Sequence, residues 1–246
     1  MNWILSLDEI RDEDRHRVGG KCFALSRLAR MGLNVPRTFC ITAEAYRRYV
    51  DATGLRERIL MELNRKEFKD MRWEEIWDSS LRIRNMFLKG LDPALLFPQL
   101  TTFLETQWHD KPVVVRSSAM DEDSGKASFA GLHDSFVNVH VSASILDHIR
   151  LVWASLWSDA ALLYRQEIGL DATISAMAVI VQEFIQGDGS GVVFSQNPNR
   201  PHEGILESVH GLNQGLVDGT IEPDRWTFDR KTRRVTSHTP GLGTHG

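Results

Sequence analysis

Apolar residues recur at helical spacing in the first part of the chain and at strand spacing later on. Leu25, Leu28 and Ala29 lie three and four residues apart, which predicts a helix that ends at Gly32. A short apolar strand is predicted next, at residues 38–41. The chain therefore begins with a helix followed by a strand.

Residues 55–107 predict a run of helices. Asp92 followed by Pro93 is a typical cap and first-turn pair and predicts the start of one of them. Another is predicted to bury one face, formed by Trp73, Ile76, Trp77, Leu81 and Phe87.

After residue 110 the pattern changes to strands. The segments "PVVVRSS", "SFVNVHV" and "SAMAVIVQEFI" each predict a strand, and the last is the most strand-like in the chain. Shorter strands are predicted at 192–195 and 205–209, followed by a hairpin in "RWTFDRKTRRVTS". One long helix interrupts this region. It is predicted to be capped by Ser142 or Ser144, to end at Gly169, and to bury Ile145, Ile149, Val152, Trp153, Leu156 and Ala160.

This order of elements predicts an α+β fold that is helix-rich first and strand-rich afterwards. The glycine-rich stretch "QGDGSG" is the predicted hinge between two lobes, residues 1–186 and 187–246.

Composition narrows the classes of function. The 246 residues are 42% hydrophobic and 25% charged, with a net charge of −4, so nucleic acid and anionic membranes are not expected partners. Any bound anion needs a local cluster of donors. Two cysteines are too few for a disulfide framework, and no apolar run approaches the roughly 20 residues of a membrane helix. The start of the chain does not read as a signal peptide, and a cytoplasmic location is expected.

The first candidate site is "VGGK", which ends at Lys21. Paired glycines let backbone amides approach a ligand, a helix N-terminus favours anions, and Lys21 would add an ammonium for phosphate. The alternative is a purely structural helix entry, because the longer spacing of a P-loop is missing.

The second candidate site starts at Arg116, a cation at the end of an apolar strand. Its planar fork suits phosphate oxygens. The alternative is an ion pair with Asp121 or Glu122. The following "SFAGLHDSF" supplies Ser128 and Gly131 for a flexible lid over phosphates, and its His133 is the histidine most suited to face a ligand.

The third candidate site is "ESVHGLNQGLVDGTIEPDRW", in which Glu207 ends a strand and glycines recur every four residues. This spacing also fits ordinary turns, and it is not a dinucleotide fingerprint because no suitable helix follows.

Taken together, four blocks in one order resemble a known family. They are "VGGK" with "ALSRLARMGLNVPRTFCIT", "VVVRSSAMDED" with "SFAGLHDSF", "VIVQEFI" with "GSGVVFSQNP", and "ESVHGLNQGLVDGTIEPDRW". The chain is similar to the N-terminal nucleotide-binding domain shared by phosphoenolpyruvate synthase, pyruvate phosphate dikinase and the rifampicin phosphotransferases.

The resemblance implies an ATP-grasp fold in which two lobes hold ATP in a cleft. In that family the matching lysine and arginine bind phosphates, which implies this role for Lys21 and for Arg116, the expected catalytic residue. The segment from Ser128 to Gly131 corresponds to the family's lid. The strand "VIVQEFI" would lie at the adenine. The candidates for base recognition, partly through the backbone, are therefore Gln182, Glu183 and Ile185. Glu207 is the candidate for the ribose or for ordering the cleft.

The sequence also departs from the family. Relatives commonly read glycine-leucine-glycine-glutamate where this chain reads Gly211-Leu212-Asn213-Gln214, so an amide replaces a carboxylate. The family's Mg²⁺ ligands are expected beyond residue 246, and no metal ligand is assigned within the chain. The phosphohistidine swivelling domain and the acceptor-substrate domain are expected in the full-length protein.

The chain is therefore expected to be a piece, truncated at its C-terminus, of a dikinase-type phosphotransferase. That enzyme would pass phosphate from ATP to a carrier histidine and then to pyruvate or another acceptor, and the isolated chain would be inactive. The alternatives are a nucleotide-sensing module that transfers nothing and a scaffold that has lost its ligand.

Overall fold

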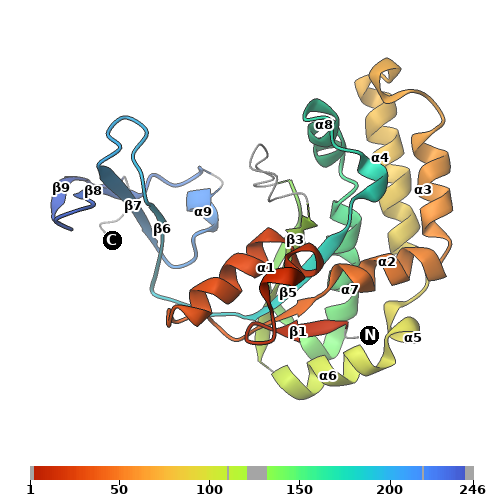
Figure 1. Ribbon diagram of the computed structural model, residues 1–246, viewed down its shortest axis with the longest axis horizontal. Helices are drawn as coiled ribbons and strands as arrows, with labels where there is room; N and C mark the ends of the chain where they lie inside the picture. Colours follow the sequence, from red (N-terminus) through yellow and green to blue (C-terminus); the bar gives the residue numbers. More distant parts are fainter. Residues whose placement is uncertain (1–2, 110, 121–131, 218, 242–246) are drawn as a thin grey trace. The chain divides into compact units, whose positions relative to one another are not determined.

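The structure is a computed structural model that describes residues 3–109, 111–120, 132–217 and 219–241 (Figure 1). The chain divides into two compact units, Met1–Phe184 and Ile185–Gly246. The fold is a mixture of helix and sheet, as the α+β prediction requires.

The first unit is built on a five-stranded antiparallel sheet with the strand order β1-β2-β5-β3-β4. Its strands are β1 (Ile4–Ser6), β2 (Thr38–Ile41), β3 (Pro112–Ala119), β4 (Ser135–His140) and β5 (Met177–Glu183). The central strand β5 is buried from Met177 to Gln182, because strands flank both its edges and helices cover both faces. The strand at residues 38–41 and the three longer strands of this sheet are thus confirmed.

Helices lie on both faces of this sheet (Figure 1). Alternate residues of β5 belong to two apolar clusters: Val179 and Val181 pack in the larger one with the helical layer, whereas Ala178 and Ile180 pack in the smaller one against α1. We call the side of the sheet that packs against α1 the α1 face. The helices are α1 (Arg15–Arg30), α2 (Ala43–Ala52), α3 (Leu55–Leu63), α4 (Trp73–Leu88), α5 (Pro93–Leu96), α6 (Pro98–Trp108), α7 (Val141–Ser155) and α8 (Asp159–Glu167), with 3₁₀ turns at Asp12–Asp14, Phe68–Asp70 and Ala172–Ile174.

The predicted start of a helix at Asp92 is confirmed, since the Asp92 carboxylate accepts a hydrogen bond from the Ala94 amide at 2.9 Å. The predicted buried face of α4 is wrong for three of its five members. Ile76 and Phe87 are buried, but the exposed residues include Trp73, Trp77 and Leu81.

Two serines explain which face of α4 is buried. Ser80 Oγ donates to the Trp157 carbonyl at 2.7 Å, and Ser79 Oγ donates to Glu62 Oε1 at 3.0 Å. Hydroxyls are tolerated in a core when they donate to buried acceptors. Because serine counts as polar in a hydrophobic pattern, the prediction placed the buried face on the side of the tryptophans instead.

The long helix predicted to end at Gly169 is two helices, α7 and α8. Ser158 Oγ accepts a hydrogen bond from the Ala161 amide at 3.1 Å and caps the second helix. Arg165 Nη1 donates to the Leu156 carbonyl at 2.7 Å and satisfies an acceptor that the break leaves outside any helix.

The predicted caps of this region are also wrong. Helix α7 begins at Val141 with His140 as its N-cap, ahead of Ser142 and Ser144. Ala160, predicted to be in the core, is exposed because it lies in the first turn of α8 and not on a continuation of α7.

The second unit is a four-stranded antiparallel sheet in the order β6-β7-β8-β9. It contains β6 (Gly189–Phe194), β7 (Glu203–His210), β8 (Asp224–Asp229) and β9 (Val235–Thr239), with the short helix α9 (Gln214–Val217). The predicted hairpin is confirmed as β8 and β9. Within the described ranges of both units, no helix combines the length and the apolarity that crossing a bilayer requires.

Candidate functional site

Helix α1 is kinked at Gly19, and hydrogen bonds join it to strand β3 at the kink. Gly19 has φ 74° and ψ 169°, and a Cβ at this position would lie 2.3 Å from the Ser118 carbonyl oxygen. Ser118 Oγ donates to the Val18 carbonyl at 2.7 Å and accepts from the Cys22 amide at 3.1 Å. The helix therefore begins at Arg15, earlier than "VGGK" predicts, and restarts at the glycine pair against β3. A restarting helix offers amides that lack carbonyl acceptors within the helix.

The kink brings Lys21 to the strand that carries Arg116. Lys21 Nζ lies 3.5 Å from Ser117 Oγ, one residue from Arg116 in the sequence. The charge of Lys21 also acts on His133. Burial, followed by the charges of Arg165 and Lys21, lowers the pKa of His133 from 6.5 to about 3. His133 is therefore a neutral imidazole near pH 7.

Arg116 lies within β3, which continues to Ala119, so its predicted place at a strand end is wrong. It is half-buried and donates from Nη2 to Gln182 Oε1 at 2.9 Å. Its Nε is buried, and among the described residues it has neither a hydrogen-bond partner nor a carboxylate that forms an ion pair with the guanidinium. Burial lowers the pKa of the guanidinium. Arg116 thus carries a charge for which the described part of the protein provides only a neutral amide.

The predicted alternative partners Asp121 and Glu122 lie outside the described residues. The predicted lid residues Ser128 and Gly131 lie outside them too, so their roles stay predictions.

Gln182 connects Arg116 to a residue that the sequence did not single out. Gln182 Nε2 donates to Thr38 Oγ1 at 2.8 Å, and Thr38 Oγ1 donates to the Pro36 carbonyl at 2.7 Å. Thr38 and Gln182 are both buried. The sequence offered one signal for Thr38, since it is the polar residue that begins the apolar strand "TFCI". Its partner Gln182 could be found only from the order of the strands in the sheet.

The other two residues predicted at the base are placed differently. Glu183 forms an ion pair with Lys111 at 3.9 Å, and its backbone amide donates to the Arg37 carbonyl at 2.8 Å. The next amide, of Phe184, donates to the Pro112 carbonyl at 3.1 Å. Ile185 follows with a side chain that is 55% exposed. The structure therefore brings Gln182, but not the Glu183 side chain, to Arg116.

Glu207 lies in the second unit within β7, which continues to His210, so its predicted place at the end of a strand is wrong. Arg225 of the neighbouring strand β8 contacts its carboxylate. Arg225 Nη2 and Nε lie 2.5 and 2.7 Å from Glu207 Oε1. Gln214 is the first residue of α9.

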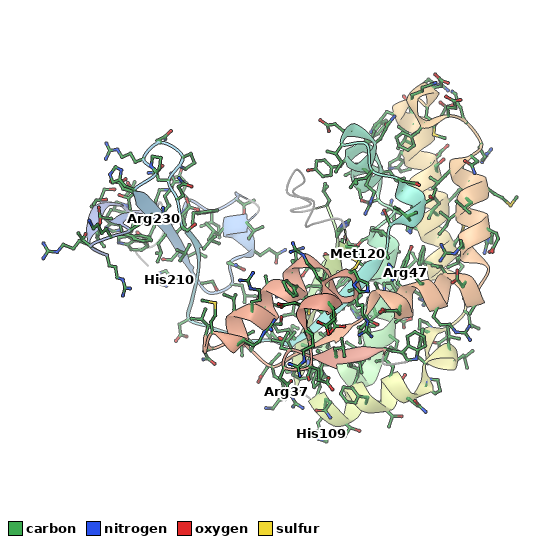
Figure 2. All side chains as sticks on the ribbon, in the orientation of Figure 1. Arg37, Arg47, His109, Met120, His210 and Arg230 are labelled. Atoms are coloured by element: carbon green, nitrogen blue, oxygen red, sulfur yellow. The ribbon has the colours of Figure 1, made fainter. Side chains whose placement is uncertain are left out.

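Another arginine of the first unit makes its contacts elsewhere. Arg37, labelled in Figure 2, donates to the carbonyl and to the side-chain oxygen of Gln107 on α6, and its guanidinium lies 5.2 Å from the centre of the Trp108 ring. Arg37 precedes Thr38, so it belongs to the same strand end but serves the helical layer. It is a natural control for Arg116.

Metal ligands were predicted beyond residue 246. Among the residues that the structure describes, no group of three or more His, Cys, Asp or Glu side chains is placed to hold a metal ion. No step is therefore assigned to a metal ion, and the predicted position of the Mg²⁺ ligands stays a prediction.

With this geometry in view, comparison with known proteins identifies the family. Residues 15–242 match the AMP/ATP-binding domain of pyruvate phosphate dikinase. The chain belongs to this family. The match includes both parts of the site on the α1 face, from the kink at Gly19 to Gln182.

Curated members of the dikinase family show similarity over nearly the whole chain. A phosphoenolpyruvate synthase of Aeropyrum pernix is 34% identical over 241 residues, 94% of this chain, and a probable phosphoenolpyruvate synthase of Methanocaldococcus jannaschii is 31% identical over 242 residues, 96% of it. A rifampicin phosphotransferase of Streptomyces sviceus is 36% identical over 225 residues, 90% of it. The chain spans only 29%, 20% and 26% of the lengths of these three relatives. It is thus an ATP-binding domain of a family whose members are longer.

Proposed function

We propose that this chain binds ATP on the α1 face of the first unit and holds its phosphates with Arg116 and Lys21. The observation that carries the proposal is the half-buried guanidinium of Arg116: within the described ranges its Nε has no hydrogen-bond partner, and its Nη2 donates to a neutral amide. Arginine has five N–H donors and no acceptor, so most of its hydrogen-bonding capacity is left for a ligand.

The electrostatics of Arg116 favour an anion as that ligand. A desolvated charge is costly unless an opposite charge compensates it. Phosphate oxygens match the planar guanidinium in two parallel hydrogen bonds, and a lysine ammonium adds a second point charge. Lys21, on the first turn after the kink, lies beside β3 at Ser117 and suits this second role.

The remaining contacts of the nucleotide are part of the same proposal. The backbone of Glu183 and Ile185 would border the base, and Ser128 to Gly131 would cover the phosphates, as in the family. Glu207 would meet the ribose through Oε2, because Arg225 contacts its Oε1. An ATP-grasp arrangement, in which two lobes would hold the nucleotide, is part of this proposal.

In the full-length protein, phosphate would pass from ATP to a histidine of a separate domain and then to an acceptor. The names of the relatives, phosphoenolpyruvate synthase and rifampicin phosphotransferase, support a phosphotransferase of this kind. Pyruvate or another acceptor would be bound by a third domain, and Mg²⁺ ligands would come from residues after 246. The full-length enzyme would be cytoplasmic.

A second candidate is a module that senses nucleotide and transfers nothing. It is favoured by Gln214, where an amide stands in place of the family's carboxylate. The full-length protein would decide between the two: consumption of ATP with pyruvate or another acceptor supports the enzyme, and binding without consumption supports the sensor.

Calorimetric titration of the 246-residue chain with ATP tests the site itself. Arg116→Met keeps the apolar stem and removes the guanidinium, and we expect it to weaken binding roughly 10- to 100-fold, as for the loss of a charged hydrogen bond. Arg37→Met is the matched control and should bind ATP like the parent, because Arg37 contacts Gln107 and Trp108. Equal affinities for the parent and Arg116→Met would refute the assignment of Arg116.

A further inference from the structure

A line of hydrogen bonds crosses three neighbouring strands on the α1 face and ends at Arg116. It runs from Thr38 on β2 through Gln182 on β5 to Arg116 on β3, and these strands are adjacent in the order β2-β5-β3. The two links measure 2.8 Å from Gln182 Nε2 to Thr38 Oγ1 and 2.9 Å from Arg116 Nη2 to Gln182 Oε1. The first two members are almost fully enclosed, with exposed fractions of 4% for Thr38 and 8% for Gln182.

The direction of this line is determined at both ends. Thr38 has a single hydroxyl proton, and it donates that proton to the Pro36 carbonyl at 2.7 Å, so its oxygen is left as an acceptor. Gln182 must therefore present its NH₂ group to Thr38, which turns its carbonyl oxygen toward Arg116. At the other end Arg116 has only donors, and it needs that oxygen. A reversed amide would set donor against donor at Arg116.

The same bonds engage both polar ends of the Gln182 side chain within the protein. An amide that is held by Thr38 on one side and Arg116 on the other is poorly suited to read the edge of a base. It is well suited to hold a long cationic side chain in one direction, and a side chain fixed before the ligand arrives loses less rotamer freedom on binding.

We propose that Thr38 and Gln182 are positioning residues that orient the Arg116 guanidinium for the phosphates of the nucleotide. The proposal rests on the proposed function of Arg116 as a phosphate ligand, and it replaces base recognition as the role of the Gln182 side chain. Its consequence is specific: the Thr38 hydroxyl contributes to binding of the phosphates and not to binding of the nucleoside.

The test compares ATP with adenosine, which has the same base and ribose but no phosphate. Thr38→Val removes the hydroxyl at nearly constant volume and leaves the Gln182 amide free to turn. We expect the Kd for ATP to rise roughly 3- to 10-fold, as for one lost hydrogen bond, and the Kd for adenosine to stay that of the parent. Thr38→Ser keeps a hydroxyl and should recover most of the affinity for ATP.

Two further variants separate positioning from simple structural support. Gln182→Met should weaken the binding of ATP and leave the binding of adenosine unchanged. If the Gln182 side chain instead contacted the base, the same substitution would weaken the binding of both. In an Arg116→Met background, Thr38→Val should have no further effect on ATP, because the residue through which Thr38 acts is gone. Thermal unfolding of each variant confirms that it is folded, and Gln182→Met carries the test if Thr38→Val does not fold.

The outcomes also separate this proposal from the one beneath it. If Arg116→Met weakens ATP binding but Thr38→Val and Gln182→Met do not, Arg116 binds phosphate without this support and the positioning role is overturned. Equal losses for ATP and adenosine overturn it as well. If neither the parent nor any variant binds ATP, the proposed function fails, and the positioning role fails with it.

Discussion

Arg116 in the first unit and Arg225 in the second both lie on strands of antiparallel sheets and contact a residue of the neighbouring strand, but their partners differ in charge. Arg225 places two nitrogens 2.5 and 2.7 Å from a single carboxylate oxygen of Glu207, and its side chain is 55% exposed. Arg116 is half-buried, and its partner is the neutral amide of Gln182. A paired arginine near solvent is explained by the fold, whereas an enclosed arginine with a neutral partner calls for an anion from outside.

The surroundings of the two arginines differ in the same way. The backbone near Arg116 is held by a close contact of Gly19 with Ser118, at a conformation with φ 74° and ψ 169° that essentially only glycine adopts. In the second unit, Gly211 also has a positive φ of 70°, but nothing lies within 4 Å of the position its Cβ would take. One glycine is needed for close packing of helix on strand, and the other for the turn alone.

The largest effect is therefore expected for Gly19→Ala. Backbone strain and a clash with the Ser118 carbonyl should together lower the free energy of unfolding by about 3–5 kcal/mol. Gly211→Ala is the control and should cost about 1–2 kcal/mol, for the left-handed backbone only. Denaturant unfolding measures both. Equal costs would show that α1 can leave β3 without penalty.

Gln182→Glu converts the partner of Arg116 into a carboxylate, so that Arg116 would face a charged partner as Arg225 does in the second unit. The introduced charge would compensate the guanidinium from within and repel phosphate at close range. We expect the Kd for ATP to rise roughly tenfold or more. Calorimetry beside Gln182→Met distinguishes the added charge from the lost amide. An unchanged affinity for ATP would mean that the neutrality of this partner has no part in binding.

The smallest effect is expected for Arg225→Met. An ion pair at this exposure should contribute no more than about 1 kcal/mol to stability, and its loss should weaken ATP binding far less than Arg116→Met does. Thermal unfolding and calorimetry on the same sample provide both values. A loss of ATP affinity as large as that of Arg116→Met would give Arg225 a ligand role and end the contrast between the two arginines.

Much of the local structure was predictable, because it depends on neighbours in the sequence. Strand β2 was predicted at its observed bounds, and the Asp92 cap was found where its local chemistry indicated. Two errors have different causes. The break before α8 had a local signal, the Ser158 cap, that the prediction of one long helix overlooked. The buried face of α4 depends on acceptors elsewhere in the chain, at Glu62 and Trp157. No periodicity within a window reports such partners.

The candidate site shows the same division. Residue type and local pattern were enough to select Lys21 and Arg116, because a cation in an apolar strand and a glycine pair at a helix are local signals. Gln182 was selected only through the resemblance to the family. What each does depends on the sheet. Arg116 and Gln182 are 66 positions apart in the chain, and Gln182 and Thr38 are 144 apart.

The sequence by itself determined most of the periodic elements, the family and the cation proposed to bind phosphate, because all three depend on nearest neighbours and short motifs. Only the tertiary structure decided that β5 lies between β2 and β3, and that order alone brings Thr38, Gln182 and Arg116 into one line. Hydrogen bonds across a sheet depend on which strands become neighbours, and that choice is made by the burial of whole faces rather than by any single segment.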